Sequence, residues 1–247
     1  IPFIARYRKE ATGELNDQIL RELYDRLMYL RNLEQRREDV RRLIDEQGKL
    51  TTEISQALDK AASLQEIEDI YRPYKPKRRT RATIAKEKGL EPLANLILAQ
   101  EQAITLSDIE PFIDPEKGVE SADDALAGAL DIVAEHISDD AETRKIIRDI
   151  FRQKGSVRST GIVEEVSTYS MYYDFAEPVS KIPSHRVLAI NRGEREKFLQ
   201  VTIEVDEEKV VQTIISRFTD EKSPCFDLIS QAARDAYQRL IAPSIER

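Results

Sequence analysis

The chain has 247 residues, of which 34% are charged, and a formal net charge of -8. This length is sufficient for one large domain or two modest domains with a buried core. No apolar run approaches the roughly 18 residues of a membrane-spanning helix, and the single cysteine, Cys225, cannot form an internal disulfide. We therefore expect a cytoplasmic protein without a membrane segment.

A long helix is the first element that the sequence predicts. Asn16 is a residue type that caps helices, and Gly48 suits the left-handed conformation that ends them. Four leucines between them recur at spacings of three and four residues, namely Leu20, Leu23, Leu27 and Leu30. A helix of roughly 30 residues would be about 45 Å long and would present these leucines on one face.

Two shorter helices follow, and each has a recognisable start. Thr51 can cap the first, while Ser63 with Glu66 forms the capping-box pattern of the second. We expect the second helix to stop before Pro73, because proline disfavours helical geometry in the residue that precedes it.

A strongly basic segment begins where this helix ends. Residues 72–81 contain six basic residues and no acid, and residues 72–88 contain eight basic residues and one acid. The longer stretch carries +7, so the remainder of the chain carries -15. Because charges more than about 8–10 Å apart are largely screened at physiological salt, this segment can attract phosphate although the chain is acidic. We expect its prolines to keep it extended, with Tyr71 and Tyr74 presenting flat rings beside the cations.

Two interpretations of this charge remain open. The first is contact with a nucleic-acid backbone, for which the candidate residues are Lys75, Lys77, Arg78, Arg79, Arg81, Arg6, Arg8 and Lys9. The second is pairing with carboxylates of the same chain, which has 46 acidic residues, or of a partner protein. Arginine forms paired hydrogen bonds with carboxylates as readily as with phosphates, so charge alone does not decide.

The next elements are similar to a helix-turn-helix over residues 80–99. Thr80 can cap a first helix, Gly89 can close it, and Pro92 suits the first turn of a second helix. The second helix offers no arginine or lysine and little besides Asn95 that could reach a base edge. We therefore expect contacts that position the protein on the backbone without reading sequence.

The pattern becomes mixed in the second half of the chain. Helices are expected from Ser121 and from Asp139, and helical spacing returns at Val210. Residues 199–205 alternate apolar and polar side chains, which is typical of a strand with one buried face, and residues 156–163 are a weaker candidate for its partner. The predicted fold class is mainly α, multi-helical with one long helix and a small β-hairpin or sheet in the second half.

The sequence predicts three parts. Residues 1–155 form an N-terminal helical domain that contains the basic segment and the helix-turn-helix-like residues 80–99. Residues 156–206 form a small mixed α/β segment, and residues 207–247 form C-terminal helices that lead to further domains. Residue 1 is Ile rather than Met, and the chain stops at Arg247 without a turn or helix breaker after Pro243. We therefore expect the sequence to be a piece of a longer protein.

Residues suited to catalysis or metal binding are sparse. The eight glycines have neither dinucleotide-binding nor phosphate-loop spacing, and two distant histidines with one cysteine do not make the usual zinc site. Aspartate pairs at 123–124 and 139–140 lie at predicted helix starts, where acids ordinarily stabilise the helix. The aromatic residues within 169–175 have no nearby arginine or lysine, which favours core packing or a protein interface over base stacking. We expect no enzyme, no cofactor and no metal.

Four segments of the chain are distinctive in sequence. Residues 1–13 read Ile-Pro-Phe-Ile-Ala-Arg-Tyr-Arg-Lys-Glu-Ala-Thr-Gly, and residues 73–80 read Pro-Tyr-Lys-Pro-Lys-Arg-Arg-Thr. Residues 89–94 read Gly-Leu-Glu-Pro-Leu-Ala, and residues 182–186 read Ile-Pro-Ser-His-Arg. In order and spacing, these segments resemble the N-terminal region of the bacterial Tex family of transcription accessory proteins.

This resemblance implies a multidomain protein of the transcription machinery, related in architecture to a eukaryotic elongation factor and histone chaperone. It implies downstream RNase H-like, helix-hairpin-helix and S1 domains, of which the S1 domain is the principal RNA-binding module. It adds no catalytic residue at these positions.

Two functions of different class follow. The first is a non-catalytic helical scaffold that contacts the backbone of DNA or RNA without sequence specificity. The alternative is a protein-protein interaction platform that docks the downstream domains or the transcription machinery. The salt dependence of nucleic-acid binding distinguishes them, because each phosphate contact contributes to its slope.

Overall fold

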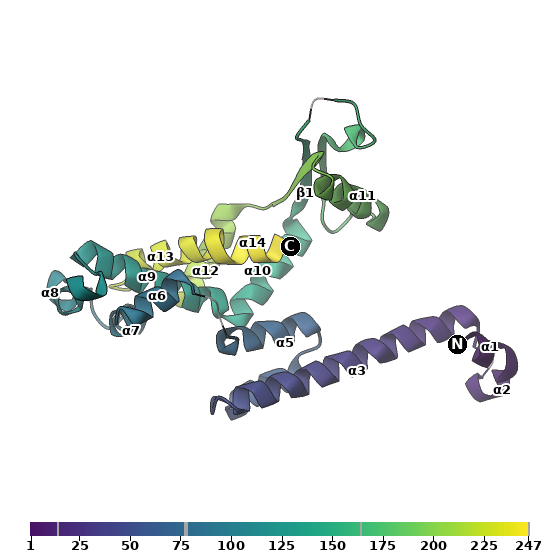
Figure 1. Ribbon diagram of the computed structural model, residues 1–247, viewed down its shortest axis with the longest axis horizontal. Helices are drawn as coiled ribbons and strands as arrows, with labels where there is room; N and C mark the ends of the chain where they lie inside the picture. The colour runs from purple at the N-terminus through teal and green to yellow at the C-terminus, as the bar shows by residue number, and fades with distance from the viewer. Residues whose placement is uncertain (14, 77–78, 164, 247) are drawn as a thin grey trace. The chain divides into compact units, whose positions relative to one another are not determined.

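The computed structural model describes residues 1–13, 15–76, 79–163 and 165–246, and of Pro2 and Lys9 it describes the backbone alone. The chain is mainly helical with one small antiparallel sheet in its second half, so the predicted fold class is confirmed (Figure 1). Contacts within the chain divide it into two compact units, Ile1–Lys75 and Pro76–Arg247. The three-part division expected from the sequence, with boundaries at 155 and 206, stays a prediction.

The first unit is built around the long helix α3. Asn16 caps this helix as predicted, because its side-chain oxygen accepts a hydrogen bond of 2.9 Å from the backbone N–H of Ile19. The helix is continuous over 29 residues (Figure 1). The helical elements of this unit are α1 (Pro2–Tyr7), α2 (Lys9–Thr12), α3 (Asp17–Asp45), α4 (Thr52–Lys60), α5 (Leu64–Tyr71) and the 3₁₀ turn η1 (Arg72–Tyr74).

The core of the first unit covers only the C-terminal half of α3. Its buried residues are Leu33, Val40, Ile44, Leu58, Ala61, Ile67 and Tyr71. Arg37 of α3 donates to the carbonyl oxygens of Leu58 and Ala61, at 2.8 and 3.0 Å. These hydrogen bonds give a donor to carbonyl groups at the C-terminal end of α4. The N-terminal half of α3 is covered less, because Leu20 is buried but Leu23 and Leu27 remain 55% and 40% exposed. The predicted apolar face is therefore buried only in part.

The helices of the second unit gather around α9. This helix contacts α6, α7, α8, α10 and α13, and half of its buried residues are alanine or serine. A Cβ atom at Gly128 would lie 2.4 Å from Cδ1 of Leu90, so glycine lets the turn after α6 come close. The elements are α6 (Arg81–Glu87), α7 (Glu91–Ala99), α8 (Leu106–Ile109), η2 (Glu110–Phe112), η3 (Pro115–Lys117), α9 (Ala122–Asp139), α10 (Ala141–Lys154), α12 (Glu207–Phe218), α13 (Phe226–Asp235), the π-helical stretch η5 (Ala236–Ile241) and α14 (Ala242–Glu246).

The sheet of the second unit has three antiparallel strands in the order β2-β1-β3. The strands are β1 (Ser156–Gly161), β2 (Asp174–Pro178) and β3 (Leu199–Glu204), accompanied by η4 (Ser170–Tyr172) and α11 (Ser184–Arg195). The predicted pairing of residues 156–163 with residues 199–205 is confirmed as β1 with β3. The strand β2 was not predicted, because its Asp-Phe-Ala-Glu-Pro sequence has two acids and a proline.

The aromatic residues before β2 form a small separate core. Tyr169 and Tyr172 are buried, and they pack with Ile190 of α11 and Leu199 of β3. The expectation of packing rather than base stacking is confirmed for these two rings. No helix among the described residues is long and apolar enough to span a membrane.

Removing a core side chain from one unit tests whether each has its own core. We expect Leu58→Ala to destabilise the first unit by about 2–5 kcal/mol, because Leu58 is fully buried and its removal leaves a cavity. Hydrogen exchange should accelerate in α4, α5 and the second half of α3, and not in α9. The matched variant Ile137→Ala, in the buried face of α9, should do the reverse. Equal acceleration in both units for either variant would contradict separate cores.

Candidate nucleic-acid interface

The basic segment runs from the end of the first unit into the start of the second. Lys75 is the last residue of the first unit, and Arg79 lies close to the start of the second. Lys77 and Arg78, which lie between them in sequence, are outside the described residues. The surroundings of the cations are therefore known separately on each side of the boundary.

In the first unit, the tyrosine rings near the basic segment pack against the core of that unit. Tyr71 is only 5% exposed, and the guanidinium carbon of Arg36 lies 5.5 Å from the centre of its ring. Arg36 also donates to a carboxylate oxygen of Glu68 at 2.6 Å, and this hydrogen bond raises the pKa of Arg36. The Tyr74 ring packs partly against the same core, and its carbonyl oxygen accepts a hydrogen bond of 3.0 Å from Gln47.

Two expectations are corrected by this arrangement. Tyr71 does not present a flat ring beside the cations, because it closes the core that α4 and α5 form on α3. Residues Arg72–Tyr74 form a 3₁₀ turn rather than an extended connector, since Pro73 fits the first turn of such a helix.

Lys75 differs from the residues before it because its charged side chain is exposed to solvent. Its backbone N–H is held by the carbonyl oxygen of Tyr71 at 3.0 Å, while its side chain is exposed. Its ammonium group pairs with no carboxylate among the described residues. Arg72, by contrast, is half-buried and already interacts within the chain.

On the second side, Arg79 is held only loosely. Its Nη2 lies 3.5 Å from Oε2 of Glu87, and the two side chains are 73% and 63% exposed. Ion pairs as exposed as this one contribute about 0–1 kcal/mol, because water screens them and two long side chains lose freedom. A phosphate can therefore replace Glu87 at little cost.

Arg81 lies in an acidic environment formed by α9. The residue before it, Thr80, caps α6 by accepting from the N–H of Thr83 at 3.1 Å, and its hydroxyl donates to Glu135 at 3.0 Å. Burial raises the pKa of Asp131 above its ordinary value, while the positive charges of Arg239 and Arg81 lower it. The charge of Arg81 thus partly compensates acids of its own unit, which makes it less available than Arg79.

The remaining candidates are distributed rather than gathered. Arg6 and Arg8 are exposed beside α1, which contacts α3, whereas Lys75 follows a turn that Gln47 holds just beyond the other end of α3. A 29-residue helix is about 44 Å long, so the first unit does not bring these cations together. The side chain of Lys9 is outside the described residues.

The helix-turn-helix-like residues form two helices joined by a tight turn. Gly89, with a φ of +86°, follows α6, and α7 begins two residues later. Both helices pack against α9, and α7 leaves Asn95 and Leu96 exposed. The two helices are confirmed, whereas entry of α7 into a DNA groove stays a prediction. No group of three or more His, Cys, Asp or Glu residues suited to a metal ion occurs within the described ranges.

Sequence reasoning missed the acids that neutralise part of the basic charge. Asp131 and Glu135 stand four residues apart on one helix, and this spacing shows only that they share a face. Nothing in the sequence indicated that this face lies toward Arg81. The pairing of Arg36 with Glu68 was likewise not predictable, because it joins α3 to α5 across 32 residues.

The fold and the candidate interface define a mainly helical protein with a small sheet and exposed cations where its two units adjoin in sequence. The chain belongs to the Tex family. Residues 100–247 match the family's "Tex central region-like" segment, and residues 1–45 match the "Tex-like protein N-terminal domain".

Individual relatives agree with this assignment. The chain is 42% identical over 253 residues to "Uncharacterized protein YdcI" of Bacillus subtilis, covering 100% of the chain and 35% of that protein. It is 42% identical over 207 residues to "Transcriptional accessory protein Tex" of Neisseria gonorrhoeae, covering 82% of the chain and 27% of that protein. It is 28% identical over 265 residues to the human "S1 RNA-binding domain-containing protein 1", covering 100% of the chain and 26% of that protein. The chain thus spans about a third or less of the length of these relatives.

Replacing Arg81 tests its role within the fold. In Arg81→Gln, we expect the pKa of Asp131 to rise further, because one of the two cations that lower it is gone. A carboxyl group with a raised pKa in the folded state loses stabilising effect as the pH rises through that pKa. The variant should therefore be less stable than the wild type at neutral pH, and the difference should shrink below the ordinary carboxyl pKa of 3.8.

NMR titration of Asp131 and denaturant unfolding at several pH values measure both effects. The matched control is Arg79→Gln, which should change neither quantity because the pair of Arg79 with Glu87 is exposed. An unchanged Asp131 titration in Arg81→Gln would show that Arg81 is not engaged with α9.

Proposed function

We propose that this chain is a non-catalytic helical scaffold of a Tex-family transcription accessory protein, and that its basic segment contacts the nucleic-acid backbone without sequence specificity. The observation that carries the proposal is the state of the cations that flank residues 77–78. Lys75 is exposed without a carboxylate partner among the described residues, and Arg79 has only an exposed one. With Lys77 and Arg78 between them in sequence, these residues supply a run of positive charge.

Backbone contact suits this segment better than base recognition. Lysine and arginine neutralise phosphates whatever the sequence, whereas base reading needs a helix, strand or stacked ring that reaches base edges. Of the two rings that were expected beside the cations, that of Tyr71 is buried and cannot stack on a base. The name of the human relative refers to RNA binding, which supports RNA as one ligand, and DNA is the other.

The scaffold role is proposed from what the chain contains. Two histidines and one buried cysteine provide few groups for catalysis, and burial raises the pKa of Cys225, which disfavours a reactive thiolate. The long helix α3 and the α9-centred second unit instead supply rigid elements. Partners of the longer protein would include the downstream RNase H-like, helix-hairpin-helix and S1 domains.

The salt dependence of binding tests the proposal. We expect a variant with Lys75, Lys77, Arg78 and Arg79 replaced by glutamine to bind unrelated sequences more weakly and about equally so. The slope of log affinity against log salt should flatten by about 0.9 for each lost contact on duplex DNA, or by about 0.7 on single strands. Fluorescence anisotropy at several salt concentrations measures this. Separate replacement of Arg81 should change the slope less, because its charge is partly compensated.

The matched control removes the same number of exposed cations elsewhere. Replacing Lys181, Arg195, Lys197 and Lys222 by glutamine gives the same net charge while leaving the basic segment intact. This control should keep the wild-type slope. If the two variants lose affinity equally, general charge and not the basic segment drives binding. If neither changes affinity or slope, backbone contact by this segment is excluded.

A second candidate function, the protein-protein interaction platform, is favoured by an exposed apolar surface. We call this surface the α1–α3 stripe, and its members are Phe3, Ile4, Tyr7, Ile19, Leu23, Leu27 and Leu30. The rings of Phe3 and Tyr7 lie 5.1 Å apart, and the leucines follow one face of α3. Exposed apolar side chains that gather along one helix face, as these leucines do, are typical of a protein interaction site.

Leucine replacement separates this function from the first. Because Leu23 and Leu27 are exposed, we expect the double variant Leu23→Ser, Leu27→Ser to change the unfolding free energy by only about 0.5 kcal/mol. If the stripe docks the transcription machinery, binding to purified bacterial RNA polymerase should weaken about tenfold, while nucleic-acid affinity is unchanged. Surface plasmon resonance measures the first and anisotropy the second. Unchanged polymerase binding would exclude the stripe as its docking site.

A further inference from the structure

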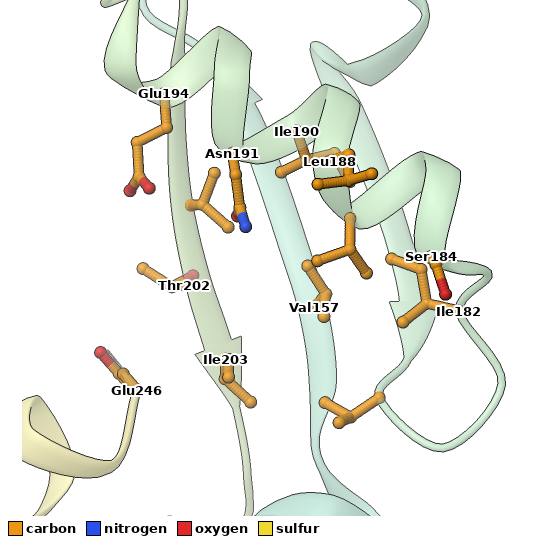
Figure 2. A pocket seen from close by; sticks show the side chains of 13 residues that line it. Val157, Ile182, Ser184, Leu188, Ile190, Asn191, Glu194, Thr202, Ile203 and Glu246 are labelled. Atoms are coloured by element: carbon orange, nitrogen blue, oxygen red, sulfur yellow. The ribbon is translucent and has the colours of Figure 1, made fainter. Parts of the chain in front are cut away.

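A groove of about 810 Å³ runs beside the sheet of the second unit (Figure 2). Its volume lies within the range of pockets that bind ligands of moderate size. Helix α11 forms one side, strand β3 forms the base, and the end of α14 lies opposite. The side chains that line it include Val157, Ile182, Leu188, Val201 and Ile203, so most of its surface is apolar.

The outer edge of β3 opens along this groove. Ile162 donates its backbone N–H to the carbonyl oxygen of Phe198 at 2.9 Å, which fixes the hydrogen-bonded positions of the antiparallel pair. Because these positions alternate, the backbone of Thr202 faces β1, and the N–H and C=O groups of Val201 and Ile203 face away from it. In the described part of the chain, β3 is an edge strand and no strand pairs with these groups. The groove therefore contains free main-chain donors and acceptors.

Close packing of α11 keeps the groove in place. A Cβ atom at Gly193 would lie 2.6 Å from Cδ1 of Leu199, so this glycine lets the helix lie near the first residue of β3. Ile190, one turn earlier, is 1% exposed and anchors the helix in the small core. Asn191 and Glu194, on the side of α11 that lines the groove, remain exposed. A helix fixed beside an open strand edge is a rigid receptor for an extended chain.

Two carboxylates define the charge of the groove. Figure 2 shows Glu194 and Glu246 on the side of β3 that faces away from β1. Neither forms an ion pair with any described residue. Burial also raises the pKa of Glu246, so its carboxylate is partly removed from water. A positive charge supplied by a bound molecule would relieve this cost.

We propose that this groove binds an extended basic-apolar peptide segment that adds to the outer edge of β3 as a fourth strand. The peptide exchanges main-chain hydrogen bonds with Val201 and Ile203, as peptides do when they extend a sheet. Its alternate side chains are apolar and lie against the groove, and lysine or arginine residues near its ends pair with Glu194 and Glu246.

Charge argues against a second copy of the chain as the occupant. Antiparallel pairing of two β3 edges would bring the Glu194 and Glu246 carboxylates of both copies to one interface. Like charges placed opposite each other across strands are destabilising. A basic peptide has the opposite effect, so the groove favours a segment of complementary charge.

Binding is tested on the chain with a fluorescein-labelled peptide that alternates valine and threonine and carries lysine at both ends. We expect it to bind at least about tenfold more tightly than a glutamate-ended peptide and than a lysine-ended peptide with N-methylated backbone amides. Glu194→Lys should remove the preference for lysine ends. The matched variant Glu221→Lys makes the same charge change at an exposed position outside the groove and should retain it. Equal binding of all three peptides would overturn the proposal.

Hydrogen exchange measured by NMR distinguishes strand addition from looser contact. The amides of Val201 and Ile203 should exchange rapidly in the free chain and become protected when the lysine-ended peptide binds. The amide of Thr202 should be protected in both states, because it faces β1. Leu188→Lys, at a groove residue that is 70% exposed, should weaken binding of the peptide without unfolding the chain.

Three further results would overturn the proposal. One is peptide binding without protection of Val201 and Ile203. Another is protection of these amides by concentration-dependent dimerisation, which would identify a second copy as the occupant. The third is protection of the same amides in a longer form of the protein that no longer binds the peptide, which would assign the groove to a segment of the protein itself.

Discussion

Close packing on α9 is the constraint on which the second unit depends. The buried face of this helix is rich in alanine, and Gly128 admits the side chain of Leu90 where a larger residue would collide with it. Small residues let neighbouring helices approach, so α6, α7 and α13 all contact the same helix. The position of α6 follows from this packing, and with it the positions of Arg79, two residues before the helix, and of Arg81, its first residue.

The acidic residues of the same helix also determine which cations of the basic segment are partly neutralised. The half-buried Asp131 and Glu135 of α9 interact with Arg239, Thr80 and the charge of Arg81. Arg79, only two residues before Arg81, forms among the described residues one ion pair, with the exposed Glu87. Partial burial strengthens the interaction of a charge with its partner, whereas exposure leaves the charge to the solvent and to external ligands. A segment that looks uniformly basic in sequence is therefore divided by its surroundings into structural and available charges.

The available charges of this chain have both signs, at separate places. Lys75 and Arg79 flank residues 77–78 in sequence with positive charge, whereas Glu194 and Glu246, which form no ion pair with a described residue, place negative charge beside the open edge of β3. We propose a polyanion as the partner of the first charges and a basic extended peptide as the partner of the second. The apolar α1–α3 stripe is a third surface of a different kind. Membership of the Tex family is consistent with a chain that makes contacts through several surfaces.

Local signals in the sequence predicted the elements more successfully than the contacts between them. The caps at Asn16, Thr51 and Ser63 are present as hydrogen bonds, because a cap depends only on residues within one turn. Likewise, the alternation in residues 199–205 identified β3.

Long-range features had no such signal. The burial of Tyr71 results from three helices folding together, and the partial compensation of Arg81 depends on a helix some 50 residues later in the chain. The leucines of α3 show the same limit, since their spacing predicted one apolar face but could not show that, among the described residues, Leu23, Leu27 and Leu30 remain exposed. The groove beside β3 was also not predictable, because α11, β3 and α14 meet there only in the folded unit.

Lysine-acylation footprinting with and without nucleic acid measures directly whether the cations around residues 77–78 are open to phosphate. Duplex DNA or single-stranded RNA of unrelated sequence should slow the acylation of Lys75 and Lys77 while leaving the exposed Lys181 and Lys197 unchanged, and high salt should abolish the protection. If Lys75 and Lys77 react equally fast in the presence and absence of nucleic acid, while other lysines become protected, the account is contradicted.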